Sequence, residues 1–280
     1  MLLDTHGVVD PTTLDPALPS VSLYNNEVQI MFDPMAHKYT VHDVQVDNGV
    51  PFFPPSVTKI LKVIDKSDAL VPWGARMAHE KFIELVRPGL PYSIEEIERI
   101  GWAIRNAHKD TLDDAGGVGK ETHEWIFNYC QARAGEGDFP APPDEVRTRN
   151  CCRAARAWIL NVDLRPFMKE RLLYSRKLRV VGTADAGSFQ VLKENRRSAI
   201  LDYKTSNKLY ASYRLQLSAY RMMLAEMTGV TLDDRYLIRL DKDPVEGSDG
   251  FHPVCLPPEE ADADEEAFCG LVAAYKQLNK

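Results

Sequence analysis

The sequence lacks any feature that would place it in a membrane or send it out of the cell. No apolar run approaches the roughly 20 residues that a membrane-spanning helix requires. The first twenty residues are acidic and rich in proline and threonine, and they have neither the basic start and apolar centre of a secretory signal nor the arginines of a transit peptide. We therefore expect residues 1–20 to be a flexible leader and the protein to act inside the cell, with no membrane partner.

Cysteine is scarce, and its spacing does not indicate a metal site. The five cysteines include no CxxC pair, and the adjacent Cys151 and Cys152 suit neither a disulfide framework nor a zinc site. An iron–sulfur cluster needs four thiolates that converge in space, which this spacing does not favour. We expect reduced, mostly buried thiols and no iron–sulfur cluster.

The net charge of −7, taken as an average over the chain, disfavours a nucleic-acid partner. Its distribution is uneven, because residues 166–221 contain twelve lysines and arginines but only four acids, whereas residues 257–266 are strongly acidic. Salt screening limits the field of each patch to roughly 10 Å, so a locally basic surface can bind phosphate on an acidic protein. A solvated face with scattered lysines explains the same charges, and both interpretations stay open.

The chain has 280 residues and 44% hydrophobic content, enough to bury a large core. Polar and apolar residues alternate between residues 21 and 50, which predicts short antiparallel strands. Ser56 is a candidate N-cap of a helix, and helical periodicity follows at residues 73–86, 94–108 and about 145–160. The proline-rich residues 137–145 are expected to form a loop.

The periodicity changes in the second half of the chain. Residues 171–192, 197–206 and 235–240 are predicted strands, residues 211–229 are an amphipathic helix that Gly229 can end, and residues 259–278 are a closing helix. This order predicts an α/β fold with a central mixed β-sheet flanked by helices and a mostly helical N-terminal half. We expect an N-terminal β-hairpin and helical wall in residues 21–115 and a core domain in residues 116–280.

The predicted strand that ends near Ser206 carries an acid and a base at its end. Asp202 and Lys204 lie two residues apart, so both side chains project from one face of the strand. Asp185 ends the preceding strand, and a hairpin can bring it beside Asp202. Two neighbouring carboxylates repel unless a cation lies between them, Mg²⁺ prefers oxygen ligands, and a lysine beside such a metal can activate water. A surface Asp–Lys ion pair is the alternative interpretation of an isolated pair.

Five short motifs occur in one order along the chain: "GKETH" with His123, "KERLL" with Glu170, "GTAD" with Asp185, "DYKTS" with Asp202 and Lys204, and "QLSAY" with Gln216 and Tyr220. Together they resemble the PD-(D/E)xK nuclease superfamily, and within it the RecB-like branch of phage and bacterial exonucleases, Cas4-type nucleases and the mitochondrial genome-maintenance exonuclease. The segments "PPSVTKIL" and "VPWGARMA" are also similar to the lead-in of phage members. The resemblance covers residues 119 to about 220 and implies a restriction-endonuclease-like core.

The resemblance implies a role for each matched residue. Asp185, Asp202 and the backbone carbonyl of Tyr203 would bind Mg²⁺ or Mn²⁺ together with a ring nitrogen of His123. The implied catalytic residues are Lys204, Asp202, Asp185 and Glu170. The residues implied in DNA binding are Gln216, Tyr220, Thr205, Ser206, Lys208 and Arg214. The cysteines of the cluster-bearing relatives have no counterpart in this sequence.

Simpler interpretations of these residues stay open. His123 can be a structural histidine on a helix, and Gln216 and Tyr220 can simply pack their helix onto the sheet. The segment "GGVGKET", residues 116–122, departs from a phosphate-binding loop because Asp114 and Glu121 occupy positions that require glycine and Ser or Thr. We expect its glycines to form a flexible lead-in to the helix that carries the histidine.

The sequence therefore predicts a Mg²⁺- or Mn²⁺-dependent DNA nuclease that hydrolyses phosphodiester bonds in a bacterial or phage-infected cell. The resemblance favours an exonuclease on single-stranded or linear DNA in replication, recombination or repair, with replication or recombination proteins as candidate partners. A nuclease-fold DNA-binding or assembly factor without cleavage is one alternative. An endonuclease of RNA or DNA is another.

Overall fold

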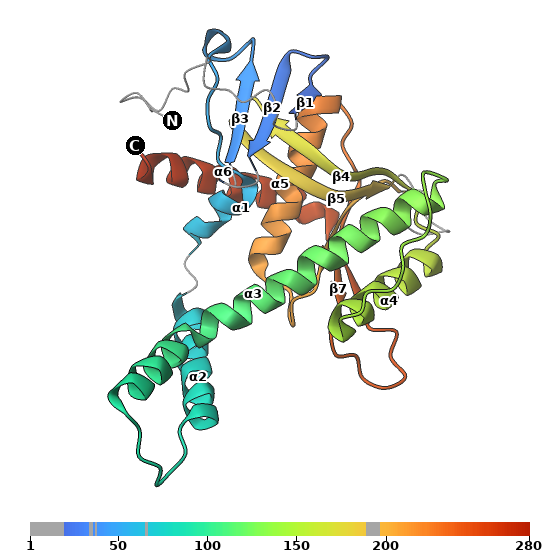
Figure 1. The fold of residues 1–280 in the computed structure, drawn as a ribbon. Helices are drawn as coiled ribbons and strands as arrows, with labels where there is room; N and C mark the ends of the chain where they lie inside the picture. Colours follow the sequence, from blue (N-terminus) through green and yellow to red (C-terminus); the bar gives the residue numbers. More distant parts are fainter. Residues whose placement is uncertain (1–19, 34–35, 37, 65–66, 189–196) are drawn as a thin grey trace.

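The computed structural model describes residues 20–33, 36, 38–64, 67–188 and 197–280. The predicted leader, residues 1–20, lies outside these residues apart from Ser20. The described residues form two β-sheets, with helices on both faces of the larger sheet and a helical arm that projects from it (Figure 1). None of the helices in this part of the chain is long and apolar enough to cross a membrane.

A five-stranded mixed sheet forms the centre of the fold. Its strands are ordered β4-β5-β6-β7-β8, with β6 and β7 parallel and every other neighbouring pair antiparallel. Helix α5 connects the parallel pair, because parallel neighbours require a crossover. The predicted α/β fold with a central mixed sheet is confirmed. The strands are β4 (Pro166–Ser175), β5 (Val180–Ser188), β6 (Ala199–Lys204), β7 (Asp234–Leu240) and β8 (Phe251–Leu256).

Helices cover the two faces of this sheet and form a separate hydrophobic core on each. On one face, Ile126 and Trp158 pack with Tyr203 of β6. On the other face, Leu217 packs with Ile200 of β6, because neighbouring residues of a strand point to opposite sides. The covering helices are α4 (Val146–Asn161), α5 (Ala211–Thr228), α6 (Ala261–Leu278) after a 3₁₀ turn at Pro258–Glu260, and α1 (Val57–Ile60), extended by a 3₁₀ turn at Leu61–Val63.

A small antiparallel sheet packs against one end of the β4–β5 hairpin, and it confirms the strands predicted between residues 21 and 50. In the hairpin turn, Arg176 lies 2.8 Å from both the buried Asp43 and the half-exposed Glu27. Tyr24 donates a hydrogen bond of 2.9 Å to the carbonyl of Tyr174. These contacts fix the hairpin that carries part of the site described below. The strands are β1 (Ser20–Leu23), β2 (Val28–Asp33) and β3 (Lys38–Asp43), followed by a 3₁₀ turn at Asp47–Gly49.

Helices α2 (Ser67–Leu85) and α3 (Ile94–Arg133) form the projecting arm (Figure 1). A capping box of Ser93 and Glu96 begins α3, which then continues for 40 residues onto the central sheet. Gly116, Gly117 and Gly119 lie inside this uninterrupted helix, so the predicted flexible lead-in is wrong. Packing at both ends of α3 outweighs the cost of these glycines, which is about 1 kcal/mol each relative to alanine.

Local capping signals mark other boundaries correctly. The Ser56 side chain accepts the N–H of Lys59, and Gly229 ends α5 with a φ of 72°. The sequence pattern misses β8, because Pro253 interrupts its apolar alternation, but an edge strand tolerates proline. The predicted domain boundary at residue 116 falls inside α3, and the division of the chain into domains stays a prediction.

Candidate functional site

Two of the predicted site residues lie on neighbouring strands of the central sheet. Ala186 of β5 pairs with Leu201 of β6, and one further step in this register places Asp185 opposite Asp202. The regular pairing stops there, and the Asp185 carboxylate accepts the backbone N–H of Tyr203 at 2.8 Å. Asp185 therefore lies within β5 rather than at its end, beside the aspartate of the next strand.

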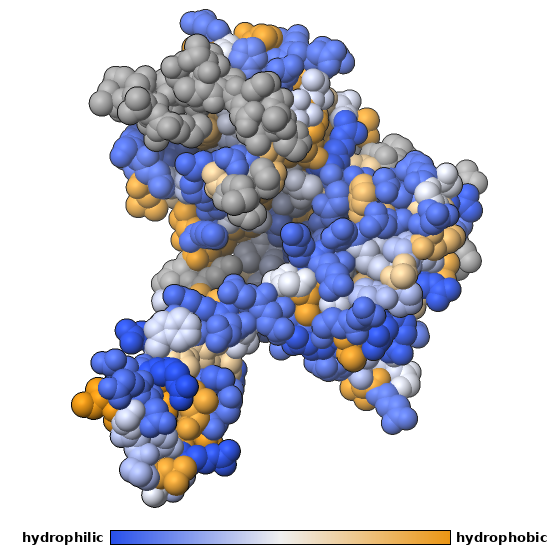
Figure 2. All heavy atoms as spheres, in the orientation of Figure 1, coloured by the Kyte–Doolittle hydropathy of each residue, from blue (hydrophilic) through white to orange (hydrophobic). Residues whose placement is uncertain are grey.

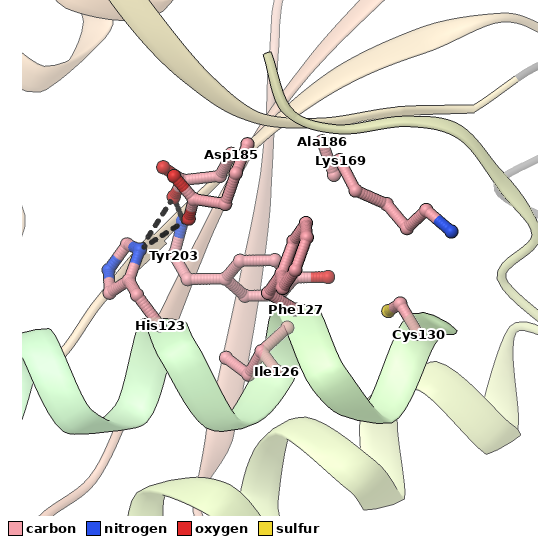
Figure 3. Close-up of a pocket in the computed structure, with 9 residues that line it drawn as sticks. His123, Ile126, Phe127, Cys130, Lys169, Asp185, Ala186 and Tyr203 are labelled. Carbon is pink, nitrogen blue, oxygen red and sulfur yellow. Dashed lines mark hydrogen bonds and ion pairs between the residues drawn. The ribbon is translucent and has the colours of Figure 1, made fainter. Parts of the chain in front are cut away.

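His123 approaches Asp185 from α3 (Figure 3), and Glu170 approaches it from β4. His123 projects from α3, and its Nδ1 lies 3.4 Å from Asp185 Oδ2 and 3.7 Å from Glu170 Oε1. One ligand atom of each residue lies within 4.8 Å of the other two, which is a set that could hold a metal ion. The structure thus brings a predicted metal ligand from a helix to the acids of the sheet.

Glu170 occupies a strained backbone position in β4. Its φ is 44°, a left-handed conformation that costs a residue other than glycine about 1–3 kcal/mol. The residues on either side keep their pairing with Ala186 and Ala184 of β5, so Glu170 lies opposite Asp185. A regular sheet persists around one distorted residue whose carboxylate belongs to the candidate metal set, which is the pattern of a functional constraint.

Asp202 is held differently from the other two carboxylates. It is 1% exposed, and the ammonium nitrogen of Lys204 lies 2.6 Å from its Oδ2. The angle of this approach is not that of a hydrogen bond, so the buried Oδ2 accepts none from the described residues. The sequence predicts Asp185 and Asp202 as the metal-binding acids, whereas the closest set of ligand atoms contains Glu170 in place of Asp202.

The pKa shifts of these groups follow from their burial and from the charges that surround them. Burial raises the pKa of Asp202 to about 6; Lys204 opposes this shift and Asp185 adds to it. Burial alone would raise the pKa of Asp185, but His123 and Lys204 outweigh it and lower the pKa. Burial disfavours both cations, yet Asp185 and Glu170 raise the pKa of His123 well above its ordinary value, and the two aspartates raise the pKa of Lys204. Three acids facing two cations favour an added positive charge.

Residues of α5 fix the position of Lys204. Its Nζ donates to Gln216 Oε1 at 3.1 Å and lies 4.6 Å from the centre of the Tyr213 ring. Gln216 in turn donates to the Tyr220 hydroxyl at 2.9 Å. The Tyr220 ring packs on Gly182, where a Cβ would lie only 2.5 Å from Cε1, so this glycine permits the close approach of helix and sheet. Gln216 and Tyr220 are both buried, and their contacts position the lysine.

The loop after β6 holds three of the predicted DNA-binding residues. A Cβ at Gly119 would lie 3.4 Å from Thr205 Oγ1, so the loop lies against α3 one turn before its histidine. The Ser206 hydroxyl donates to the carbonyl of Lys208 at 2.8 Å, and the Lys208 ammonium lies over the Tyr210 ring. The loop is therefore next to the site, with the lysine exposed.

Arg214 points to α6 and away from this group. Its guanidinium bonds both carboxylate oxygens of Asp264, at 2.8 and 2.9 Å, and also pairs with Glu260. Asp264 also contacts the buried Arg235 of β7 at 2.5 Å. This network connects α5, α6 and β7, and it engages the guanidinium that the family resemblance assigns to DNA.

The sequence analysis misses the contact of Tyr213 with Lys204. Its spacing three residues before Gln216 places both on one face of α5, which is the signal that could have indicated it. Tyr203 donates its backbone N–H to Asp185, and its buried ring packs edge-on against both His123 and Trp158. Its role as a carbonyl ligand stays a prediction.

The donor set fits a hard divalent cation. Carboxylate oxygens suit Mg²⁺ and Mn²⁺, and an imidazole nitrogen is also acceptable to Mn²⁺. A cation beside Asp202 would also give its buried Oδ2 a second electrostatic partner besides Lys204. Cys130 lines the pocket next to His123, but burial raises the pKa of its thiol to about 11, which keeps it protonated. The candidate metal set contains no cysteine.

Comparisons with known proteins give only distant similarities. No protein-family profile and no curated protein match the sequence. Solved structures similar to the chain include an alkaline exonuclease from Laribacter hongkongensis, with 13% identity, a TM-score of 0.30 and coverage of 55% of this chain and 81% of that chain. Another is SSO0001, with 12% identity, a TM-score of 0.23 and coverage of 72% and 86%. At these values neither similarity bears on what this chain does. The fold and the site define an α/β protein with a candidate divalent-metal centre.

Proposed function

We propose that this chain is a Mg²⁺- or Mn²⁺-dependent deoxyribonuclease that hydrolyses phosphodiester bonds as an exonuclease on single-stranded or linear DNA. One observation carries the proposal: His123, Glu170 and Asp185 each bring a ligand atom within 4.8 Å of the other two, and the Asp202–Lys204 ion pair lies on the neighbouring strand beside Asp185. The order of the five sequence motifs supports the same activity.

The candidate ligands have separate tasks in this proposal. A divalent ion held by His123, Glu170 and Asp185, with Asp202 alongside, would supply Lewis-acid chemistry at the phosphate. The N–H of Tyr203 orients the Asp185 carboxylate, whose side chain is 10% exposed. The acids are therefore preorganised to hold a cation without rearrangement of the sheet.

Lys204 supplies the positive charge that acts on the substrate. Its raised pKa keeps it charged, and Gln216 and Tyr213 hold the ammonium beside Asp202. As negative charge develops on the phosphate oxygens, this fixed N–H donor stabilises it more than it stabilises the ground state. Reorientation costs little because α5 already sets the position of the side chain.

A cleavage assay on linear and circular DNA, labelled at the 5′ or the 3′ end, tests the proposal. We expect Mn²⁺ to support release of mononucleotides from linear DNA and EDTA to abolish it. Circular DNA should resist cleavage, and the order in which labels appear gives the direction. Binding of DNA in EDTA without cleavage in either metal would reject the nuclease in favour of a binding factor. Cleavage of circles or of RNA would indicate an endonuclease or a different substrate.

A further inference from the structure

The arm of α3 carries a positively charged surface that leads away from the candidate site. Residues at intervals of three, four, seven and their sums share one face of a helix. Counting back from His123 in these steps gives Lys120, Gly119, Gly116, Leu112, Lys109, Arg105 and Trp102. We call this face of α3 the basic stripe. Between Trp102 and the histidine it contains three cations, and one acid, Asp113, lies at its edge.

Most acids of the same stretch lie elsewhere on the helix. Asp110, Asp114, Glu121 and Glu124 fall off the basic stripe by their spacing, whereas Asp113 lies at its edge, four residues after Lys109. Asp114 faces α4, where it accepts from Arg147 at 2.7 Å. The cations and most of the acids of this segment therefore lie on different faces of α3, a separation that the net charge of the segment does not show.

The cations of the stripe are not used within the chain. Arg105, Lys109 and Lys120 are exposed and form no ion pair with any described residue. Trp102 is 61% exposed and makes no ring contact within the part of the chain that the structure describes. These cations can bind the phosphates of a single-stranded nucleic acid, and the exposed ring of Trp102 can stack on one of its bases.

Bare backbone lies between these cations and the site. A Cβ at Gly116 would meet nothing within 4 Å, so the absence of a side chain there serves no packing inside the protein. Gly119 lies against the loop of Thr205, where the exposed Lys208 continues the positive charge. Figure 2 shows the molecule hollowed between the arm and the rest of the chain. Among the described residues, the missing side chain at Gly116 therefore leaves room for a strand to approach the helix closely.

We propose that the basic stripe of α3 seats the part of the single strand that extends beyond the bond to be cut; the inference rests on the proposed nuclease function and names its substrate as a single strand longer than the site itself. At 1.5 Å per residue, Lys109 lies about 21 Å, Arg105 about 27 Å and Trp102 about 32 Å from His123 along the helix. At about 3.4 Å per stacked nucleotide, these residues contact the strand about six, eight and nine nucleotides from the site.

Fluorescence anisotropy with labelled oligothymidylates of four and sixteen nucleotides, in EDTA, tests this placement. The variant pair Arg105→Gln/Lys109→Gln should weaken binding of the longer oligonucleotide and lower the slope of log affinity against log salt by about 1.4, or about 0.7 for each lost phosphate contact. Trp102→Ala should weaken it about fivefold or more through lost base stacking. The shorter oligonucleotide cannot reach these residues, and its binding should not change.

The matched control is Arg87→Gln/Arg99→Gln, which removes the same charge from the same arm but off the stripe. Thermal melting checks that each variant remains folded. Equal effects of the two pairs, or equal effects on the two lengths, would overturn the proposal. Cleavage of the four-nucleotide substrate by the unmodified protein in Mn²⁺ tests the nuclease separately. If that cleavage is absent while the length dependence persists, the nuclease is rejected and the strand-binding surface stands.

Discussion

Replacement of Gly182 by alanine tests whether the close packing of α5 on the sheet holds the lysine of the candidate site. The new Cβ would lie 2.5 Å from Tyr220 Cε1 and 3.0 Å from Val57 Cγ2, and both side chains are buried. Such overpacking costs about 1–3 kcal/mol of unfolding free energy, or about 2 °C or more of melting temperature per kcal/mol. Displacement of the Tyr220 ring also breaks its hydrogen bond with Gln216, the residue that holds Lys204.

The assay combines thermal melting with steady-state cleavage kinetics. We expect Gly182→Ala to lower both the melting temperature and kcat, while KM for DNA changes little because the lysine acts mainly in the transition state. The matched control is Gly270→Ala in α6, where a Cβ meets nothing within 4 Å. That substitution should stabilise the protein by up to about 1 kcal/mol through helix propensity and leave kcat unchanged.

A double variant separates the clash from other effects of the methyl group. Tyr220→Leu removes the ring that the new Cβ would strike, so its combination with Gly182→Ala should cost less than the sum of the single losses, by about 0.5 kcal/mol or more. Strict additivity, or a Gly182→Ala variant that melts with the wild type and keeps its kcat, would refute the reasoning.

Four further results are expected. Lys204→Ala should retain less than a tenth of wild-type cleavage activity, which corresponds to a barrier raised by about 1.4 kcal/mol or more, and its circular dichroism spectrum should be unchanged. The control Lys276→Ala, at an exposed lysine, should cleave normally. If Lys204→Ala retained more than a tenth of the activity, the catalytic role of the lysine would be contradicted. Asp185→Asn should lose the rise in melting temperature that Mn²⁺ gives the wild type in differential scanning fluorimetry, and an unchanged rise would exclude it as a ligand. The increase in melting temperature that Mn²⁺ gives the wild type should be larger at about pH 7.5 than at about pH 5. The raised pKa values of His123 and Asp202 leave both groups protonated at the lower pH, where a metal must displace those protons. A larger increase at about pH 5 would contradict the ligand set. Arg235→Met should lower the unfolding free energy by about 3 kcal/mol or more in chemical denaturation, because it leaves a buried carboxylate short of one partner, and a neutral effect would show that the remaining partner suffices.

The main elements of the fold could be predicted from the sequence because they depend on interactions between residues close together in the chain. The two-residue period of β6 predicts that Asp202 and Lys204 share a face, and they form an ion pair of 2.6 Å. Ser56 and Gly229 mark helix ends because a side-chain acceptor and a left-handed φ each satisfy a local requirement. The assignment of the site residues to catalysis and metal binding stays a prediction.

Features that depend on contacts between residues far apart in the chain could not be predicted from the sequence. The strained φ of Glu170 and its place beside His123 arise from the pairing of β4 with β5 and from the packing of α3, which no local pattern encodes. The partners of Arg214 lie about 50 residues away on α6, so its engagement there requires the packed fold. The glycines of α3 led to the prediction of a flexible segment because glycine has a low helix propensity, whereas in the fold tertiary packing keeps the helix continuous.

The continuity of α3 has a mechanical consequence. One continuous helix carries His123 over the sheet and, at its other end, the arm in which it packs with α2, so a displacement of the arm can move the imidazole. The helix bends most easily at its three glycines, which lie between the arm and His123, because they lack side chains that would brace neighbouring turns. A force on the arm would thus be transmitted along α3 to His123 of the candidate metal set.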